Sequence, residues 1–119
     1  MRVLVCGDRN WTDIEVIRQK LISIPDISVV IEGEARGADR IARQVAEELN
    51  IPVEKFPANW DKYGKAAGPI RNQQMLDEGK PDLVLAFHND LENSKGTKDM
   101  VIRADKAGVE TVVIKQKVA

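Results

Sequence analysis

The stretch SVVIEGEARGADRIARQVAEELN, residues 28–50, contains the strand, turn and helix that decide the fold. Residues 28–31 form a mostly apolar, β-branched run, which is typical of a strand buried on both faces of a parallel sheet. A polar turn with Gly33 and Gly37 follows. From 38 to 49 the apolar residues recur at helical spacing, while Arg40 and Arg43 fall on the opposite, polar face. This order predicts a strand–turn–helix unit of an α/β protein.

The same unit recurs along the rest of the chain. Short apolar runs predict further strands at 3–6, 53–56, 83–87 and 111–114. Helices are expected from Thr12, where residues 12–15 have the form of a capping box, from Pro69 to Gly79, and over 97–107. We therefore predict an α/β fold: a single Rossmann-like doubly wound domain over residues 1–119, with a mainly parallel five-stranded sheet and helices on both faces.

Composition excludes several functional classes. The 18 Lys and Arg residues are balanced by 19 Asp and Glu, so no overall basic field favours nucleic acid. One His and the single Cys6 are too few for a closed zinc site of about four ligands, so we expect neither a metal nor a resident cofactor. No apolar run approaches the roughly 20 residues that span a bilayer. We expect a cytoplasmic protein, with Lys115 and Lys117 in a solvated tail.

Ligands of doubly wound sheets bind beyond the carboxyl ends of the strands, so the strand-end turns hold the candidate site. The helix that starts near Gly37 is expected to offer unpaired N–H groups to a phosphate, although purely structural glycines are an equal alternative. The candidates in the first two turns are Gly7, Asp8, Arg9, Trp11, Gly33, Ala35, Arg36, Gly37, Ala38 and Asp39.

The connection at 58–72 is long for a compact domain, which favours a functional role. Trp60 and Tyr63 are candidates to stack on a purine, and Lys65 and Arg71 to pair with phosphate. The alternative is an aromatic plug over the sheet edge with solvated charges. Gly68 and Asn72 complete the candidates in this segment.

After the fourth predicted strand, Gly96 and Thr97 form a second candidate phosphate cradle at a helix start. Ser94 or Thr97 as a simple helix cap is about as well supported. His88 stands at a strand end, where a general base is sometimes placed, but it has no recognisable nucleophile partner. Cys6 is interpreted as a small buried apolar residue.

Four segments, GDRNW, EGEARGADRIA, WDKYGKAAGPIRNQQM and KGTKDM, resemble the SLOG superfamily of SMF/DprA and LOG proteins. The resemblance is strongest to its small YspA/YpsA-related branch, which occurs in bacteria and phages. It implies a Rossmann-like domain that binds a nucleotide or nucleotide-derived ligand, with homo-oligomer formation as a dimer or higher. LOG enzymes of the superfamily cleave nucleoside monophosphates to free base and ribose 5-phosphate, using an Arg and the Glu of a PGGxGTxxE motif.

The resemblance carries the catalytic Arg onto Arg71, and the phosphate-binding turn onto Gly96 and Thr97. The Glu does not carry over, because Met100 stands at its position and Asp99 precedes it. We therefore predict binding without turnover, as a sensor or, by analogy with small phage proteins, as a sponge for a nucleotide signal. The alternative is a LOG-like phosphoribohydrolase with Arg71 and Asp99 as catalytic residues.

A third possibility is DNA binding through a basic cluster of Lys62, Lys65 and Arg71, and the charge balance disfavours it. For the nucleotide site, Arg71→Ala and Gly37→Val are each expected to weaken binding without unfolding the domain. The first change removes a charge partner, and the second blocks close approach of the backbone.

Overall fold

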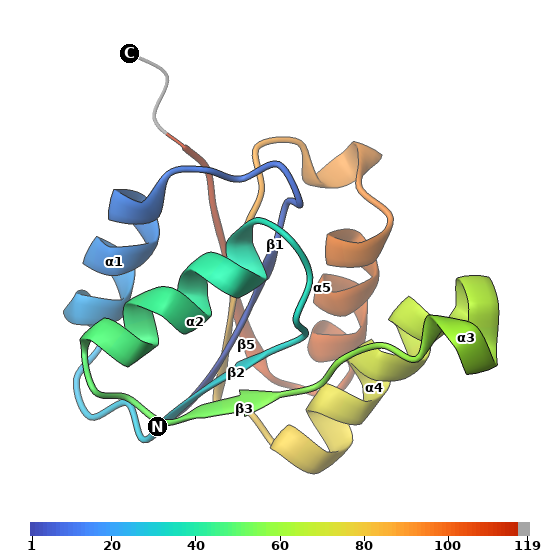
Figure 1. The fold of residues 1–119 in the computed structure, drawn as a ribbon, viewed down its shortest axis with the longest axis horizontal. Helices are drawn as coiled ribbons and strands as arrows, with labels where there is room; N and C mark the ends of the chain where they lie inside the picture. The colour runs from blue at the N-terminus through green and yellow to red at the C-terminus, as the bar shows by residue number, and fades with distance from the viewer. Residues whose placement is uncertain (117–119) are drawn as a thin grey trace.

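The computed structural model describes residues 1–116 and contains one five-stranded sheet (Figure 1). Its strands are β1 (Arg2–Gly7), β2 (Val29–Glu32), β3 (Val53–Lys55), β4 (Leu83–Phe87) and β5 (Glu110–Ile114). They lie in the order β3-β2-β1-β4-β5, and every pairing is parallel. The predicted Rossmann-like, doubly wound α/β fold is thereby confirmed. Lys117, which was expected in a solvated tail, lies outside the described residues.

Helices cover both faces of the sheet (Figure 1). On one face, α1 (Ile14–Ser23) and α2 (Ala38–Glu48) pack against Val3 and Val5 of β1, whose side chains alternate in direction along the strand. On the other face, α4 (Ala67–Gly79) and α5 (Gly96–Lys106) pack against Leu4 and Cys6. None of the helices within residues 1–116 has the length and apolar character needed to cross a membrane.

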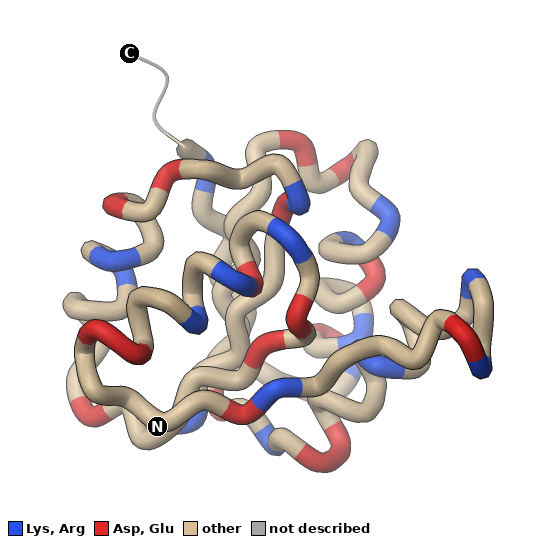
Figure 2. Tube along the Cα trace, viewed as in Figure 1, with Lys and Arg blue, Asp and Glu red and all other residues tan. Residues whose placement is uncertain are grey.

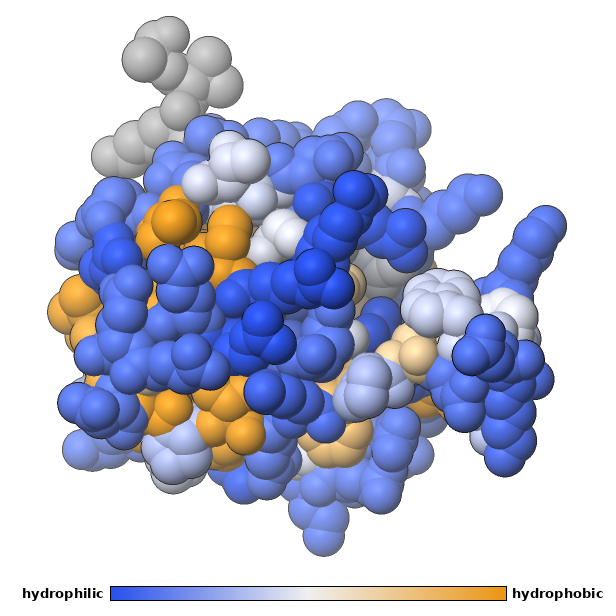
Figure 3. All heavy atoms as spheres, in the orientation of Figure 1, coloured by the Kyte–Doolittle hydropathy of each residue, from blue (hydrophilic) through white to orange (hydrophobic). Residues whose placement is uncertain are grey.

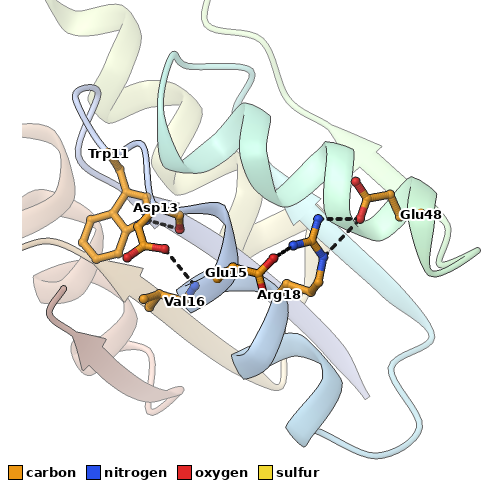
Figure 4. Close-up of polar contacts among 6 residues, drawn as sticks. All are labelled: Trp11, Asp13, Glu15, Val16, Arg18 and Glu48. Carbon is orange, nitrogen blue, oxygen red and sulfur yellow. Dashed lines mark hydrogen bonds and ion pairs between the residues drawn. The ribbon is translucent and has the colours of Figure 1, made fainter. Parts of the chain in front are cut away.

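Two helix starts differ from the sequence prediction. The N-cap of α1 is Asp13 rather than Thr12, because the Asp13 carboxylate accepts the Val16 N–H at 3.3 Å (Figure 4). The expected loop before Pro69 is mostly helical: it contains the single turn α3 (Trp60–Tyr63), a 3-10 turn (Gly64–Ala66) and the first two residues of α4. Asn59 nucleates this region by accepting the Lys62 N–H at 3.1 Å.

Trp11 and Arg18 fix the position of α1 in the fold (Figure 4). The Trp11 indole packs edge-on against Phe87 with ring centroids 5.7 Å apart, and its Nε1 donates to the Asp13 carbonyl at 2.9 Å. Arg18 pairs with Glu15 on its own helix and with Glu48 of α2 at 2.8 Å. The turn after β1 is therefore held between the sheet and α1.

The sheet order reverses beside β1, so the crevice expected to bind ligands lies at the carboxyl ends of β1 and β4. At this edge the pairing of β1 with β4 continues one residue further, because the Asp8 N–H donates to the Phe87 carbonyl at 2.9 Å. A Cβ at Gly7 would overlap that carbonyl and would lie 2.7 Å from the Ala38 Cβ. Gly7 is therefore required by close packing between β1, β4 and the start of α2.

Candidate functional site

A hollow of about 740 Å³ lies between the turn after β1, the start of α1 and one face of α2, from Gly37 to Glu47. Its volume is in the range of small-molecule sites, roughly 300–1,000 Å³. Three guanidinium groups line it, from Arg9, Arg40 and Arg43, and Glu47 supplies the one carboxylate of the lining. Figure 2 shows Lys and Arg positions along α2 and the turns that precede it, and Figure 3 shows the most hydrophilic surface over the same part of the molecule.

Sequence-predicted residues contribute part of this hollow. Arg9, Trp11 and Gly37 line it, but Trp11 is only 3% exposed and is chiefly a core residue. Arg36 is exposed just before α2 and is not among the lining residues. The sequence analysis placed Arg40 and Arg43 on the polar face of their helix without assigning them a ligand. The available signal was their spacing of three residues, which puts both side chains on one helix face.

Gly37 is required by the fold rather than by a ligand. Its φ is +75°, and a Cβ there would meet the backbone carbonyls of Asp8 and Arg9. The backbone of the turn after β1, and not a ligand, therefore approaches Gly37 closely. The Ala38 N–H donates to the Asp8 carbonyl of that turn at 3.2 Å. The predicted unpaired N–H at the first position of α2 is wrong for this reason. The close backbone atoms around residue 37 lead us to expect that Gly37→Val destabilises the fold, unlike the expectation from the sequence.

Asp39 shapes the turn after β2 from within. Its carboxylate is 4% exposed and accepts the N–H groups of Gly33 at 3.1 Å and Ala35 at 3.3 Å. Burial raises the pKa of Asp39 to about 6, against the opposing effect of the nearby Arg71 guanidinium. A negative group at this point also disfavours an anion at the first turn of α2.

Arg71 lies against the backbone of the same turn. Its Nη1 donates to the Gly33 carbonyl, and a Cβ at residue 33 would lie 2.8 Å from the guanidinium carbon. Its Nε donates to the Asn72 side-chain oxygen at 3.1 Å. The absence of a side chain at Gly33 thus leaves room for the Arg71 guanidinium. Among the predicted site residues, Gly33 and Asn72 are both in contact with Arg71.

Asn72 connects this group to α5. It is 5% exposed, and its amide donates to the Asp99 carboxylate at 2.9 Å and to the Gly96 carbonyl at 3.3 Å. Asp99 also pairs with Arg103 one helical turn later, at 2.8 Å. The two residues named as catalytic, Arg71 and Asp99, are therefore linked through one buried amide rather than in direct contact.

The start of α5 is partly satisfied by its own cap. The Ser94 hydroxyl accepts the N–H groups of Thr97 at 3.1 Å and Lys98 at 3.2 Å, which confirms the capping role foreseen for Ser94. Thr97 is only 6% exposed. A Cβ at Gly96 would meet no atom within 4 Å, so the space beside the first residue of α5 is open. A phosphate cradle at Gly96 stays a prediction.

Several predicted residues lie outside the hollow. Trp60 and Tyr63 are 50% and 41% exposed on α3, which projects from the edge of the molecule far from α2 (Figure 1). Neither lines the hollow, and neither forms the aromatic plug over the sheet edge proposed as the alternative, because α3 projects away from the sheet (Figure 1). Lys65 is exposed in the following 3-10 turn, and Gly68 is buried, its Cβ position 3.4 Å from the Trp60 ring.

His88 and Cys6 are occupied by local structure. The His88 Nδ1 accepts the Asp90 N–H at 2.9 Å, so this nitrogen is committed to the loop. Cys6 is 6% exposed, as expected for a buried apolar residue, and burial raises the pKa of its thiol. Within residues 1–116, no three His, Cys, Asp or Glu side chains are grouped so as to hold a metal ion.

Glu32 is a further residue that the sequence analysis missed, besides Arg40 and Arg43. It ends β2 with no exposed surface; one carboxylate oxygen accepts the Glu34 N–H at 2.6 Å, and the other has no hydrogen-bond partner among the described residues. Burial raises the pKa of Glu32 to about 8. Glu34 in turn pairs with Arg43 at 2.6 Å. Glu32 therefore sets the turn that holds one arginine of the hollow.

Comparison with known proteins places the chain in a family. The model of the YspA, cpYpsA-related SLOG family matches residues 1–63, which contain β1, β2, β3 and both turns beside the hollow. The Gene 61 protein of Mycobacterium phage D29 is 38% identical over 120 residues, covering 93% of this chain and 94% of the phage protein. The chain belongs to the YspA, cpYpsA-related SLOG family.

The SLOG fold is also seen in a solved structure. DNA processing protein A (DprA) from Streptococcus pneumoniae superposes with a TM-score of 0.78 at 17% identity, over 98% of this chain and 51% of that protein. This chain thus spans about half the length of DprA, and the likeness concerns the fold. Membership of the SLOG family associates the chain with nucleotide-related binding or processing.

Proposed function

We propose that this SLOG protein binds a nucleotide or nucleotide-derived small molecule at the carboxyl edge of its sheet and releases it chemically unchanged. The observation that carries the proposal is the hollow of about 740 Å³ between the turn after β1 and α2. The turn after β1 and Gly37, the last residue of the turn after β2, are strand-end positions of the kind that bind ligands in doubly wound sheets. The hollow combines charged and apolar walls, as small-molecule sites do.

The lining suits a nucleotide in two respects. Arg9 and Arg40 supply guanidinium groups that pair with phosphate oxygens through two parallel hydrogen bonds. Ile14 and Ile41 line the same hollow, and both are partly buried hydrophobic residues packed against the core. They offer apolar surface to a base or ribose, in place of the aromatic cover first expected from Trp60 or Tyr63.

The proposed role is that of a sensor or of a sponge that sequesters a nucleotide signal. The 38% identical relative in a mycobacteriophage supports the second form, since it places a protein of this size and family in a phage. A sponge acts in the host cytoplasm and must hold its ligand tightly without consuming it. Homo-oligomer formation belongs to the same proposal.

LOG-like hydrolysis of a nucleoside monophosphate is the second candidate, and one observation favours it: Asn72 joins Arg71 to Asp99 through hydrogen bonds of 3.1 and 2.9 Å. Against it, neither Asp99 nor Arg71 lines the hollow, and Asn72 and Arg103 both donate to Oδ2 of Asp99. A carboxylate that stabilises a developing ribosyl cation must lie beside the bound sugar. Binding without turnover is therefore the better-supported function.

The test uses purified protein and a panel of nucleoside monophosphates, ADP-ribose, NAD and cyclic nucleotide messengers. Thermal shifts identify what binds; a ligand at 100 times its dissociation constant adds about 2.7 kcal/mol, which is several degrees for a domain of this size. The protein is then denatured and the bound material chromatographed. Intact ligand supports the proposal. Free base with ribose phosphate supports hydrolysis, which Asp99→Asn should then abolish, and no shift with any compound rejects both.

Arg71→Ala tests the carboxyl edge separately. If the ligand extends from the hollow over the turn after β2, loss of this guanidinium weakens binding, because the Gly33 carbonyl and the Asn72 side chain lose their partner and the turn loosens. Unchanged affinity in a folded Arg71→Ala variant confines the ligand to the hollow.

A further inference from the structure

The three arginines of the hollow come from two separate segments. Arg9 lies in the turn after β1, whereas Arg40 and Arg43 lie on α2, three residues apart and hence on one face of the helix. Arg36 lies in the turn before α2, is exposed and does not line the hollow. Figure 2 shows this positive charge along α2 and the turn leading into it.

The positive charge of the hollow is only partly neutralised. Arg43 pairs with Glu34 at 2.6 Å, and Glu47 is the one acidic residue of the lining. Within residues 1–116, neither Arg9 nor Arg40 forms an ion pair. Both are exposed. Two guanidinium groups from different segments therefore remain available to one ligand.

This arrangement indicates the class of the ligand. One guanidinium holds one phosphate through two parallel N–H···O bonds, so two guanidinium groups on separate segments match two anionic groups carried by the same molecule. A diphosphate provides two such groups side by side. The volume of about 740 Å³ leaves room for more than a free diphosphate, and Ile14 and Ile41 give the remaining surface an apolar character.

We infer that the hollow between the turn after β1 and α2 binds a diphosphate or longer oligophosphate group, with Arg9 and Arg40 as its two phosphate-holding residues. The inference rests on the proposed function, because the oligophosphate is taken to belong to the nucleotide-derived ligand. It narrows that ligand from any nucleotide to one that carries at least two linked phosphates.

Calorimetric titration with inorganic phosphate, pyrophosphate, AMP and ADP tests the inference, and the first two probes do not depend on which base is preferred. A hydrogen-bonded charge pair contributes about 1.5–3 kcal/mol, so the second phosphate should strengthen binding about tenfold or more. We expect pyrophosphate to bind at least tenfold more tightly than phosphate, and we expect ADP to bind at least tenfold more tightly than AMP.

Variants locate the effect. Arg9→Ala and Arg40→Ala should each weaken pyrophosphate and ADP binding about tenfold and bring the ADP to AMP ratio close to one, with melting temperatures near that of the wild type because both side chains are exposed. Lys106→Ala, which removes one positive charge from the exposed end of α5, is the matched control and should leave the ratio unchanged.

The outcomes separate the two proposals. If the protein binds nucleotides tightly but has equal affinities for AMP and ADP, the oligophosphate inference is overturned and the proposed function stands. The same holds if the ratio of ADP to AMP affinity is unchanged in both arginine variants. Binding of pyrophosphate at Arg9 and Arg40 without any nucleotide binding supports the oligophosphate site and rejects the nucleotide. A single-stranded oligonucleotide and ADP are also compared as competitors of pyrophosphate, at concentrations counted per phosphate group. If the oligonucleotide displaces pyrophosphate at the lower concentration, the assignment to a small molecule is overturned.

Discussion

Replacing Glu32 by Gln should make the protein more stable at neutral and alkaline pH. Glu32 has no exposed surface, and one of its carboxylate oxygens has no partner among residues 1–116. Burial raises the pKa of this carboxyl from 4.5 to about 8. The folded protein therefore holds the proton more tightly than the unfolded chain. The corresponding stability is fully present below about pH 4.5 and is lost as the pH rises to about 8.

The size of the effect follows from the shift. One pKa unit corresponds to about 1.4 kcal/mol, so at pH 7 the unfolded chain gains about 3 kcal/mol from ionising Glu32 while the folded chain keeps it neutral. Gln keeps an oxygen to accept the Glu34 N–H but cannot ionise. The variant should therefore gain up to about 3 kcal/mol at pH 7, or on the order of 10 °C in melting temperature, less the cost of placing its amide protons.

Urea unfolding of both proteins between pH 5 and pH 8.5 measures this directly. The wild type should lose stability across that range, whereas Glu32→Gln should have a flatter profile. Burial raises the pKa of Asp39 from 3.8 to about 6. Both proteins should therefore lose further stability as the pH rises, but only between about pH 3.8 and pH 6. Glu78→Gln, an exposed change on α4, is the control and should follow the wild type. Parallel profiles for wild type and Glu32→Gln above pH 6 would refute the reasoning.

Three further substitutions test the local account. Gly37→Val should lower the melting temperature and the yield of folded protein, because residue 37 has a φ of +75° and its Cβ would overlap the Asp8 carbonyl; an unchanged melting curve would contradict this. Ser94→Ala should cost about 1 kcal/mol in urea unfolding through loss of the α5 cap, and a cost near zero would mean that another group replaces the hydroxyl. Trp60→Ala should leave nucleotide affinity unchanged in calorimetry, since α3 lies away from the hollow; a tenfold loss would return this residue to the site.

The fold was predictable because its signals are local. All the strands except β3, which is Val-Glu-Lys, contain a short apolar run, and α2 shows a clear apolar stripe, so residues 28–50 alone indicate a parallel α/β unit. Helix starts were less predictable, since two neighbouring residues can compete for one cap. Thr12 and Asp13 both suit the position, and only the geometry of the turn after Trp11 decides for Asp13.

The site was predictable only in part because its residues depend on packing between distant segments. The strand-end turns were found correctly, and Arg9 and Gly37 do border the hollow. Arg40 and Arg43 were interpreted only as the polar face of a helix, which is how the same pattern looks on any surface helix. Trp60 and Tyr63 had the composition of a base-stacking pair, but α3 carries them to the edge of the molecule.

The role of the glycines also required the structure. Gly33 in a strand-end turn suggested contact between backbone and ligand, whereas the space beside it is filled by the Arg71 guanidinium from α4. Nothing in the sequence pairs residues 33 and 71, which lie 38 positions apart. Glu32 was passed over for a similar reason, because its burial depends on the turn that folds back over the end of β2.

The central claim, binding without turnover at the arginine-lined hollow, is tested most directly by the chemical state of a bound nucleotide. The protein is saturated with the nucleotide that gives the largest thermal shift, freed of excess ligand, denatured and analysed by chromatography, alongside Arg40→Ala. We expect near-stoichiometric intact nucleotide from the wild type and a much smaller amount from the variant. Free base in the wild-type sample, or equal recovery from both proteins, would contradict the account.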